Sequence, residues 1–151
     1  MRSSLVLSML SFGLCIATEL PGQAARHPVT SVRVSIQKVD QVALDFGVDS
    51  AALREQAVRR LSAAGIVVKQ DSDVPELVIS VRVPRKLAPV DDGILIVETL
   101  LLEPASASNR RTLWRAVDIG RRFTRFGSLP ELVPAELDRN LEALASARPT
   151  T

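Results

Sequence analysis

The sequence has few of the side chains on which enzyme chemistry usually depends. Its 151 residues include one cysteine, one histidine, one tryptophan and no tyrosine. Cys15 and His27 both lie near the N-terminus, before the first segment with a regular hydrophobic pattern. Thiol catalysis, catalysis by a phenol and zinc sites of the Cys/His type are therefore excluded for the body of the chain.

The sequence also lacks a hydrophobic run long enough to span a bilayer. The apolar segment of residues 5–17 is shorter than the about 20 residues that a spanning helix needs. A basic residue precedes this run and a proline-glycine pair follows it, which is typical of a cleavable signal peptide. We predict a signal peptide over residues 1–24, with cleavage after Ala24. Ala25 and Ala17 are alternative sites, and an uncleaved anchor or an N-terminal core helix is the alternative interpretation.

The position of Cys15 at the end of the apolar run raises the alternative of a lipoprotein. A small residue should precede a lipidated cysteine, whereas Leu14 is bulky, so we predict that the protein is not lipidated. Without the signal peptide the chain has no cysteine and no disulfide. We expect one periplasmic or secreted domain over residues 25–151, held together by its hydrophobic core.

Charge of neither sign dominates the chain. It has 19 basic and 17 acidic residues, a net charge of +2, and the expected signal peptide removes one of each. Such a balance gives no overall field that would attract polyanions, and together with export it argues against nucleic acid as a partner. The arginines are nevertheless concentrated locally. One stretch contains six of them: Arg110, Arg111, Arg115, Arg121, Arg122 and Arg125.

Hydrophobic periodicity in the first half of the domain predicts a strand and then a helix. Apolar and polar residues alternate over residues 32–36, as in a strand with one buried face. Over residues 49–64 apolar side chains recur at helical spacing, and Gly65 is placed to end this helix. We expect residues 37–47 to form the connection between the two elements.

The rest of the chain predicts more strands and a terminal helix. Four segments have strand patterns: residues 66–68, 77–83, 94–102 and 113–119. Residues 123–127 should lead out of the sheet. Ser128 and Glu131 have the spacing of a capping box for a helix with a leucine stripe, which Pro134 should kink or restart. The predicted fold is α+β, in the order β-α-β-β-β-β-α, with a mostly antiparallel sheet of four to five strands and two helices on one face.

A resemblance follows from Leu61-x-x-x-Gly65-x-Val67, the alternation over residues 77–81, the isolated Trp114 and the amphipathic C-terminal helix. The chain without its signal peptide resembles a broad group of small exported bacterial envelope proteins. In layout it is similar to the lipopolysaccharide-assembly lipoprotein and to the N-terminal domain of the Tol-Pal translocation propeller, although it lacks an acylated cysteine. The resemblance implies an envelope setting and an accessory role, and it transfers no catalytic residue.

Short motifs add no chemistry. Residues 35–38, Ser-Ile-Gln-Lys, match the S-x-x-K spacing of penicillin-recognising enzymes, but they end a strand and the accompanying motifs are missing. Residues 71–73 lack the glycine and the distal glutamate of a calcium loop. We therefore expect no catalytic residue, metal or cofactor. The leading function is a non-enzymatic binding or accessory module of the cell envelope, and the alternative from a different class is a hydrolase-like enzyme.

The arginine-rich stretch supports a second binding hypothesis. Arg121, Arg122 and Arg125 flank Phe123 and Phe126, an arrangement in which guanidinium groups hold phosphates while the rings rest on lipid. The stretch would then bind an anion or lipid head group and make weak contact with anionic lipid or lipopolysaccharide. Alternatively, the rings belong to the core and the arginines form a solvated rim.

The strand pattern also predicts an apolar patch on the sheet face away from the helices. We expect it to be an interface with an envelope protein partner or a second copy, centred on Ile96 and Leu100. The alternative is that the connection of residues 37–47 or that of residues 84–93 covers the patch. The patch consists of Ile94, Ile96, Leu100, Leu102 and Trp114.

Overall fold

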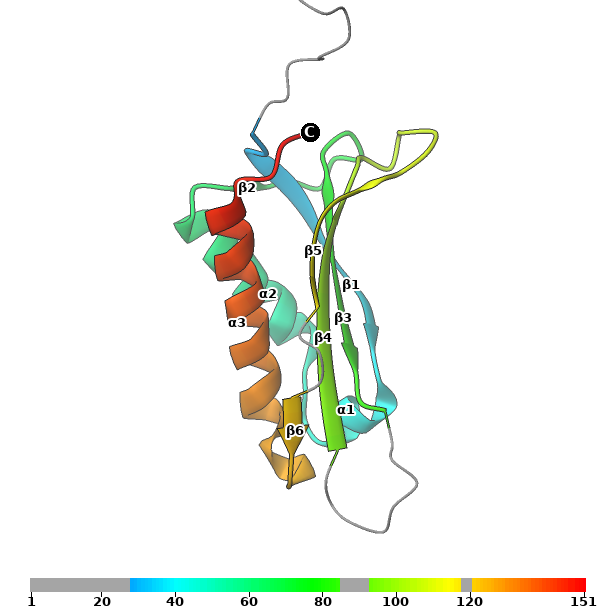
Figure 1. Ribbon diagram of the computed structural model, residues 1–151, viewed down its shortest axis with the longest axis vertical. Helices are drawn as coiled ribbons and strands as arrows, with labels where there is room; N and C mark the ends of the chain where they lie inside the picture. Colours follow the sequence, from blue (N-terminus) through cyan, green and yellow to red (C-terminus); the bar gives the residue numbers. More distant parts are fainter. Residues whose placement is uncertain (1–27, 85–92, 118–120) are drawn as a thin grey trace, which may run out of the picture.

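The computed structural model describes residues 28–84, 93–117 and 121–151. The expected signal peptide, which contains Cys15, therefore lies outside the described residues, and so does His27. The described chain forms a sheet with two long helices on one side (Figure 1). Its strands are β1 (Ser31–Val39), β2 (Val67–Val68), β3 (Glu76–Arg82), β4 (Gly93–Leu102), β5 (Thr112–Val117) and β6 (Arg121–Phe123). Its helices are α1 (Gln41–Asp45), α2 (Ser50–Ala63) and α3 (Leu129–Ala147), with a 3₁₀ turn, η1 (Phe126–Ser128), before α3.

The sheet is mixed and open. Its strand order is β2-β1-β3-β4-β5, and β6 pairs with β4. β1 runs parallel to β2 and β3, whereas the pairs β3/β4, β4/β5 and β4/β6 are antiparallel. The predicted α+β class is confirmed, with α2 and α3 on the same face of the sheet (Figure 1).

One strand was missing from the prediction. We expected the chain to leave the sheet at Phe123, but Arg121–Phe123 forms β6 and pairs with Gly93–Leu95 at the start of β4. β4 is longer than β5, which pairs only with the other end of β4, so part of the edge of β4 is left for a second partner. The sheet therefore has one strand more than the upper number we expected.

The prediction for the first long helix is confirmed in detail. The carboxylate of Asp49 accepts a hydrogen bond from the backbone N–H of Ala51 at 2.9 Å and so caps α2. Leu53, Ala57 and Leu61 are buried at helical spacing. Gly65, just past the helix, has a φ of 80°, a conformation that glycine adopts without the steric cost that other residues meet.

The segment of residues 37–47 has more structure than the connection that we expected. β1 continues to Val39, and α1 follows directly. Asp40 fastens the end of the β1/β3 ladder, because its N–H donates to Val81 O at 3.0 Å and its carboxylate accepts from the N–H of Val83 at 2.8 Å. Ala43 of α1 is fully buried in the core. This segment therefore closes one end of the core on the helix side of the sheet.

The terminal helix differs from the prediction at its start. Ser128 occupies the N-cap position, but its hydroxyl donates to Arg125 O at 2.7 Å and makes no capping bond. The preceding 3₁₀ turn holds Ser128 in a helical conformation, so the capping box does not form. Pro134 lies inside an uninterrupted α3, so the helix does not restart there, although a proline inside a helix removes the backbone bond to the carbonyl four residues earlier, here that of Pro130.

A polar group on α3 completes the backbone hydrogen bonding of β4. The Asn140 side-chain amide donates to Val97 O at 3.1 Å and to the Thr99 hydroxyl at 3.2 Å, and all three groups lie in the interior. β5 pairs with β4 from Glu98 onward and β6 pairs with it up to Leu95, so Val97 lies in the gap between them. Asn140 thus takes the place of a strand partner and fixes α3 on the sheet.

Candidate binding face

The strand register determines which side chains lie on the sheet face away from α2 and α3, here called the open face. On the helix side, Leu77 lies opposite Leu101 and Val81 opposite Val97, and all four are fully buried. Side chains alternate along a strand, so the residues between them point the other way. Ile94, Ile96, Leu100 and Leu102 therefore lie on the open face, where the sequence predicts them.

Trp114 does not belong to this group, and its inclusion in the predicted patch was wrong. It lies directly opposite Leu101 and packs against the core on the helix side. The register shifts between Leu101 and Leu102, because Leu102 pairs with Thr112 and the chain in between holds one extra residue. Such a bulge moves the following side chain to the opposite face.

The four aliphatic residues form a line along β4, here called the apolar stripe: Ile94, Ile96, Leu100 and Leu102. Each is partly buried. At about 3.4 Å per residue the stripe is about 27 Å long. Glu98 interrupts it at the centre. Val78 and Ser80 on the adjacent β3 are buried although they also lie on the open face, so neighbouring side chains already cover the middle of the sheet.

Glu98 is the centre of a charged row that crosses the sheet, here called the central triad. Its carboxylate pairs with Arg82 on β3 at 3.5 Å and with Arg115 on β5 at 2.6 Å. The Glu98 side chain is only 14% exposed, whereas those of Arg82 and Arg115 are 45% and 59% exposed. The carboxylate is thus enclosed, and the two guanidinium groups face solvent on either side of the apolar stripe.

A second group of the same composition, here called the end triad, lies toward the other end of β3. Glu76 pairs with Arg33 on β1 at 3.0 Å and with Arg110 from the β4–β5 hairpin at 2.6 Å. Burial acts to raise the pKa of Glu76, but hydrogen bonds from Arg110, Ser35 and Arg33 outweigh it and leave the pKa lowered. The two triads together hold four arginines and two glutamates, a net charge of +2.

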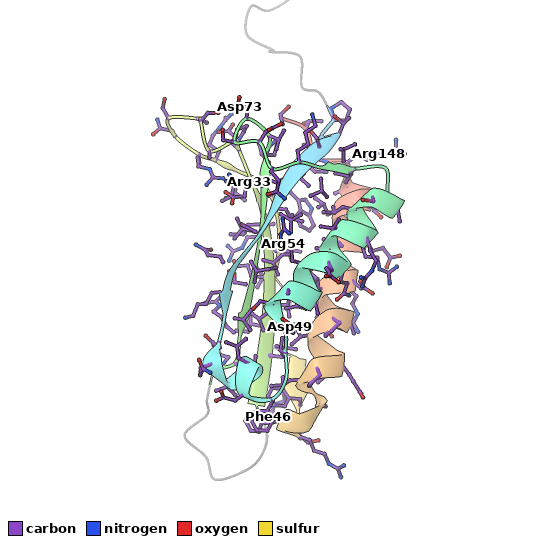
Figure 2. All side chains as sticks on the ribbon, turned by 180° about the vertical axis from the view of Figure 1, so that it is seen from behind. Arg33, Phe46, Asp49, Arg54, Asp73 and Arg148 are labelled. Carbon is purple, nitrogen blue, oxygen red and sulfur yellow. The ribbon has the colours of Figure 1, made fainter. Side chains whose placement is uncertain are left out.

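Neither long helix covers the open face: Figure 1 shows α2 and α3 on the other side of the sheet, and Figure 2, which is seen from behind, shows the same arrangement. The segment of residues 37–47, one of the covers that we considered, instead closes the end of the core. The other candidate cover, residues 84–93, falls mainly on residues 85–92, which lie outside the described residues.

The structure does not bring the arginine-rich stretch together into one site. Arg110 belongs to the end triad, Arg115 to the central triad, and Arg111 pairs with Glu103 at 2.5 Å. Arg122 and Arg125 are exposed near the start of α3, and the side chain of Arg121 is not described. The predicted anion site of Arg121, Arg122 and Arg125 therefore has two exposed members that the structure describes, and Arg125 lines a shallow hollow with Phe46 and Phe126.

The aromatic rings beside these arginines belong partly to the core. Phe123 is buried and meets Phe126 edge to face at 5.1 Å, and Phe126 stacks on Phe46 at 5.2 Å. Figure 2 shows Phe46 at the end of the molecule opposite Asp73 and Arg148. Phe46 and the nearby Leu44 are 44% and 39% exposed, a feature that our sequence reasoning missed because it treated their segment as a plain connection.

We expect Arg122 and Arg125 to contribute little to stability. Changing both to glutamine should leave the melting temperature almost unchanged, because exposed substitutions usually alter stability by no more than about 0.5 kcal/mol. Thermal unfolding followed by circular dichroism measures this. A substantially lower melting temperature would instead show that the two side chains hold the fold together.

The S-x-x-K motif of residues 35–38 lies on a strand. Ser35 and Lys38 lie on β1, where Lys38 is 63% exposed and pairs with Asp40 at 3.4 Å. Within the described ranges, no cluster of His, Cys, Asp or Glu could hold a metal ion. Nor does any described helix have the length and apolar character needed to cross a membrane. A hollow of about 470 Å³ between β5 and the C-terminal segment is lined without aspartate, glutamate or histidine, whereas a second hollow of the same volume, beside the start of β1, includes Asp73 and Glu103.

Comparisons with known proteins give structural neighbours only. No protein-family model matches the chain, and no curated protein matches it. The chain is similar to a minor lipoprotein from Acinetobacter baumannii, with 12% identity and a TM-score of 0.47 over 82% of this chain and 96% of that one. It is also similar to the PelC dodecamer from Paraburkholderia phytofirmans, with 17% identity and a TM-score of 0.49 over 80% of this chain and 87% of that one. With TM-scores below 0.5, these similarities carry no argument about function.

Proposed function

We propose that the domain is a non-enzymatic binding module of the cell envelope that docks a partner through its open face. The observation that carries the proposal is the apolar stripe of β4, which neither long helix covers. An aliphatic side chain that is moved completely from water into an interface gains about 1.5–3 kcal/mol. The four residues of the stripe are already partly buried, so only part of this free energy remains to be gained when a partner covers them.

The chemistry of the open face supports binding rather than catalysis. The carboxylates of the two triads, Glu76 and Glu98, each lie between two arginines, which hold them as ion-pair partners. A general acid or base needs a pKa near the working pH, whereas the arginines beside Glu76 hold its pKa below its usual value. The signal-peptide pattern of residues 1–24 supports the envelope setting.

Substitution of the stripe should remove binding and keep the fold. We expect the double variant Ile96→Asp, Leu100→Lys to lose a partner that co-purifies with the native protein from envelope fractions. It should keep its circular dichroism spectrum, because both side chains lie outside the core on the helix side. Crosslinking followed by size-exclusion chromatography of the native protein and of the double variant measures the loss of the partner.

The matched control is the double variant Ala51→Asp, Ala52→Lys, which makes the same charge changes on exposed positions of α2. It should retain the partner. If both variants retain the partner, or if the stripe variant unfolds, the open face is not a docking surface.

A further inference from the structure

The charges around the apolar stripe indicate the chemistry of the partner that fits it. This inference rests on the proposed docking function. Each guanidinium carries five N–H donors in a fixed fork. In the central triad, Arg82 and Arg115 each direct one terminal nitrogen at Glu98, at 3.5 Å and 2.6 Å. Because both side chains are about half exposed, their guanidinium groups can also reach acceptors from another molecule.

The dimensions of this surface match one helix. Arg82 lies opposite Ile96 and Arg115 opposite Leu100 on the two strands that flank β4. The two arginines are therefore separated by about 10 Å across the stripe and by about 14 Å along it, since neighbouring strands are about 4.8 Å apart and each residue adds about 3.4 Å. An α-helix with its side chains is about 10–12 Å across. The stripe length of about 27 Å corresponds to about 18 helical residues at 1.5 Å each. α2 and α3 on the opposite face show that this sheet packs against helices.

We propose that the open face binds an acidic amphipathic helix of a partner protein. The helix lies along β4 with its apolar side on the stripe, and acidic side chains on its two flanks pair with Arg82 and Arg115. The end triad adds two more arginines near the Leu102 end of the stripe. The net charge of +2 on the two triads is complementary to such a helix.

Two other occupants fit the same surface less well. A second copy docked face to face by a two-fold axis would place the same +2 surface against itself. A lipid layer would have to accept the Glu98 carboxylate in the middle of the apolar stripe, where burial of a charge is costly. A helix avoids this cost by carrying a polar side chain at the turn that lies over Glu98, which a lipid layer cannot do.

A pair of synthetic peptides tests the proposal. Both are about 18 residues long, with leucines at helical i, i+3, i+4, i+7 spacing; one has glutamates and the other lysines on both flanks of the leucine stripe. Fluorescence anisotropy should show that the glutamate peptide binds the protein without its signal peptide at least tenfold more tightly than the lysine peptide. Raising the salt concentration should narrow this difference.

Arginine variants make the test specific to the face. Arg82→Gln with Arg115→Gln should weaken binding of the glutamate peptide at least fivefold, and Arg82→Glu with Arg115→Glu should reverse the preference between the peptides. If the two glutamate substitutions disturb the neighbouring Glu98, the variant with two glutamines still tests the proposal. As a control, Arg54→Glu with Arg59→Glu on the exposed side of α2 should leave both affinities unchanged.

The outcomes separate this inference from the proposed function. The proposal of an acidic helix is overturned if the two peptides bind equally, if neither binds, or if binding does not change when Arg82 and Arg115 are substituted. The same holds if the protein instead sediments with phosphatidylglycerol vesicles in a way that depends on Ile96 and Leu100. The native partner could be lost from the Ile96→Asp, Leu100→Lys variant but retained by the Arg82→Gln, Arg115→Gln variant. In that case the proposed docking through the open face holds, and only the proposal that the partner helix is acidic is wrong.

Discussion

Replacing Gly93 with alanine should destabilise the domain by about 2–3 kcal/mol, in the upper range for overpacking a core. A Cβ at this position would lie 2.4 Å from Cζ and 2.9 Å from Cε1 of Phe123. Phe123 is buried and its ring is held against Phe126, so it has little room to move away. Denaturant unfolding followed by the fluorescence of Trp114 measures the loss.

Gly127→Ala is the matched control, because a Cβ there meets nothing within 4 Å. It should be close to neutral. The double variant Gly93→Ala, Phe123→Leu should be more stable than the sum of the two single losses predicts, because the smaller side chain makes room for the methyl group. If Gly93→Ala were as stable as Gly127→Ala, the close packing of β6 on the start of β4 would be wrong.

Asn140→Leu should cost about 1–3 kcal/mol, since it leaves buried acceptors without a donor. The lost bonds are those from the Asn140 amide to Val97 O at 3.1 Å and to the Thr99 hydroxyl at 3.2 Å. The backbone carbonyl of Val97 lies in the gap between β5 and β6, so no strand replaces the missing donor. Thermal and chemical unfolding of the variant give the size of the loss.

Two further variants isolate the role of the backbone acceptor. Thr99→Val should cost less than Asn140→Leu, because Asn140 still donates to Val97 O in that variant. Ala143→Leu, at an exposed position of the same helix, should be nearly neutral. An Asn140→Leu variant as stable as the native protein would show that the amide does not substitute for a strand partner.

Most of the larger elements could be predicted from the sequence because their periodicity reports burial directly. Leu53, Ala57 and Leu61 recur at helical spacing and are all buried in α2. Alternation along β3 and β4 likewise identified the two sides of the sheet. These elements bury one continuous face each, so local pattern and tertiary packing agree.

The elements that sequence reasoning missed are short and depend on their surroundings. Residues 41–45 have no room for a helical repeat, and α1 is fixed by the ladder-end bonds of Asp40 and the burial of Ala43. Residues 121–123 form β6 only because β4 has a free edge there. Neither cause lies in the local sequence.

The composition of the open face could be predicted only in part. The positions of Ile96 and Leu100 follow from simple alternation, but the position of Trp114 depends on a bulge that alternation does not reveal. The arginines looked like one cluster because they are close in sequence. Their partners are distant, since Arg110 bonds Glu76 34 residues away and Arg115 bonds Glu98 17 residues away, so the triads emerge only from strand pairing.

The proposed function requires that a partner covers the open face in the cell. The most direct measurement is site-specific photo-crosslinking in living cells, with a photoreactive amino acid at Ile96 and, in a separate strain, at the exposed Ala52 of α2. We expect a discrete crosslinked protein at Ile96 that is absent at Ala52 and disappears when Leu100 is also changed to lysine. The same products from both positions, or none from Ile96, would contradict it.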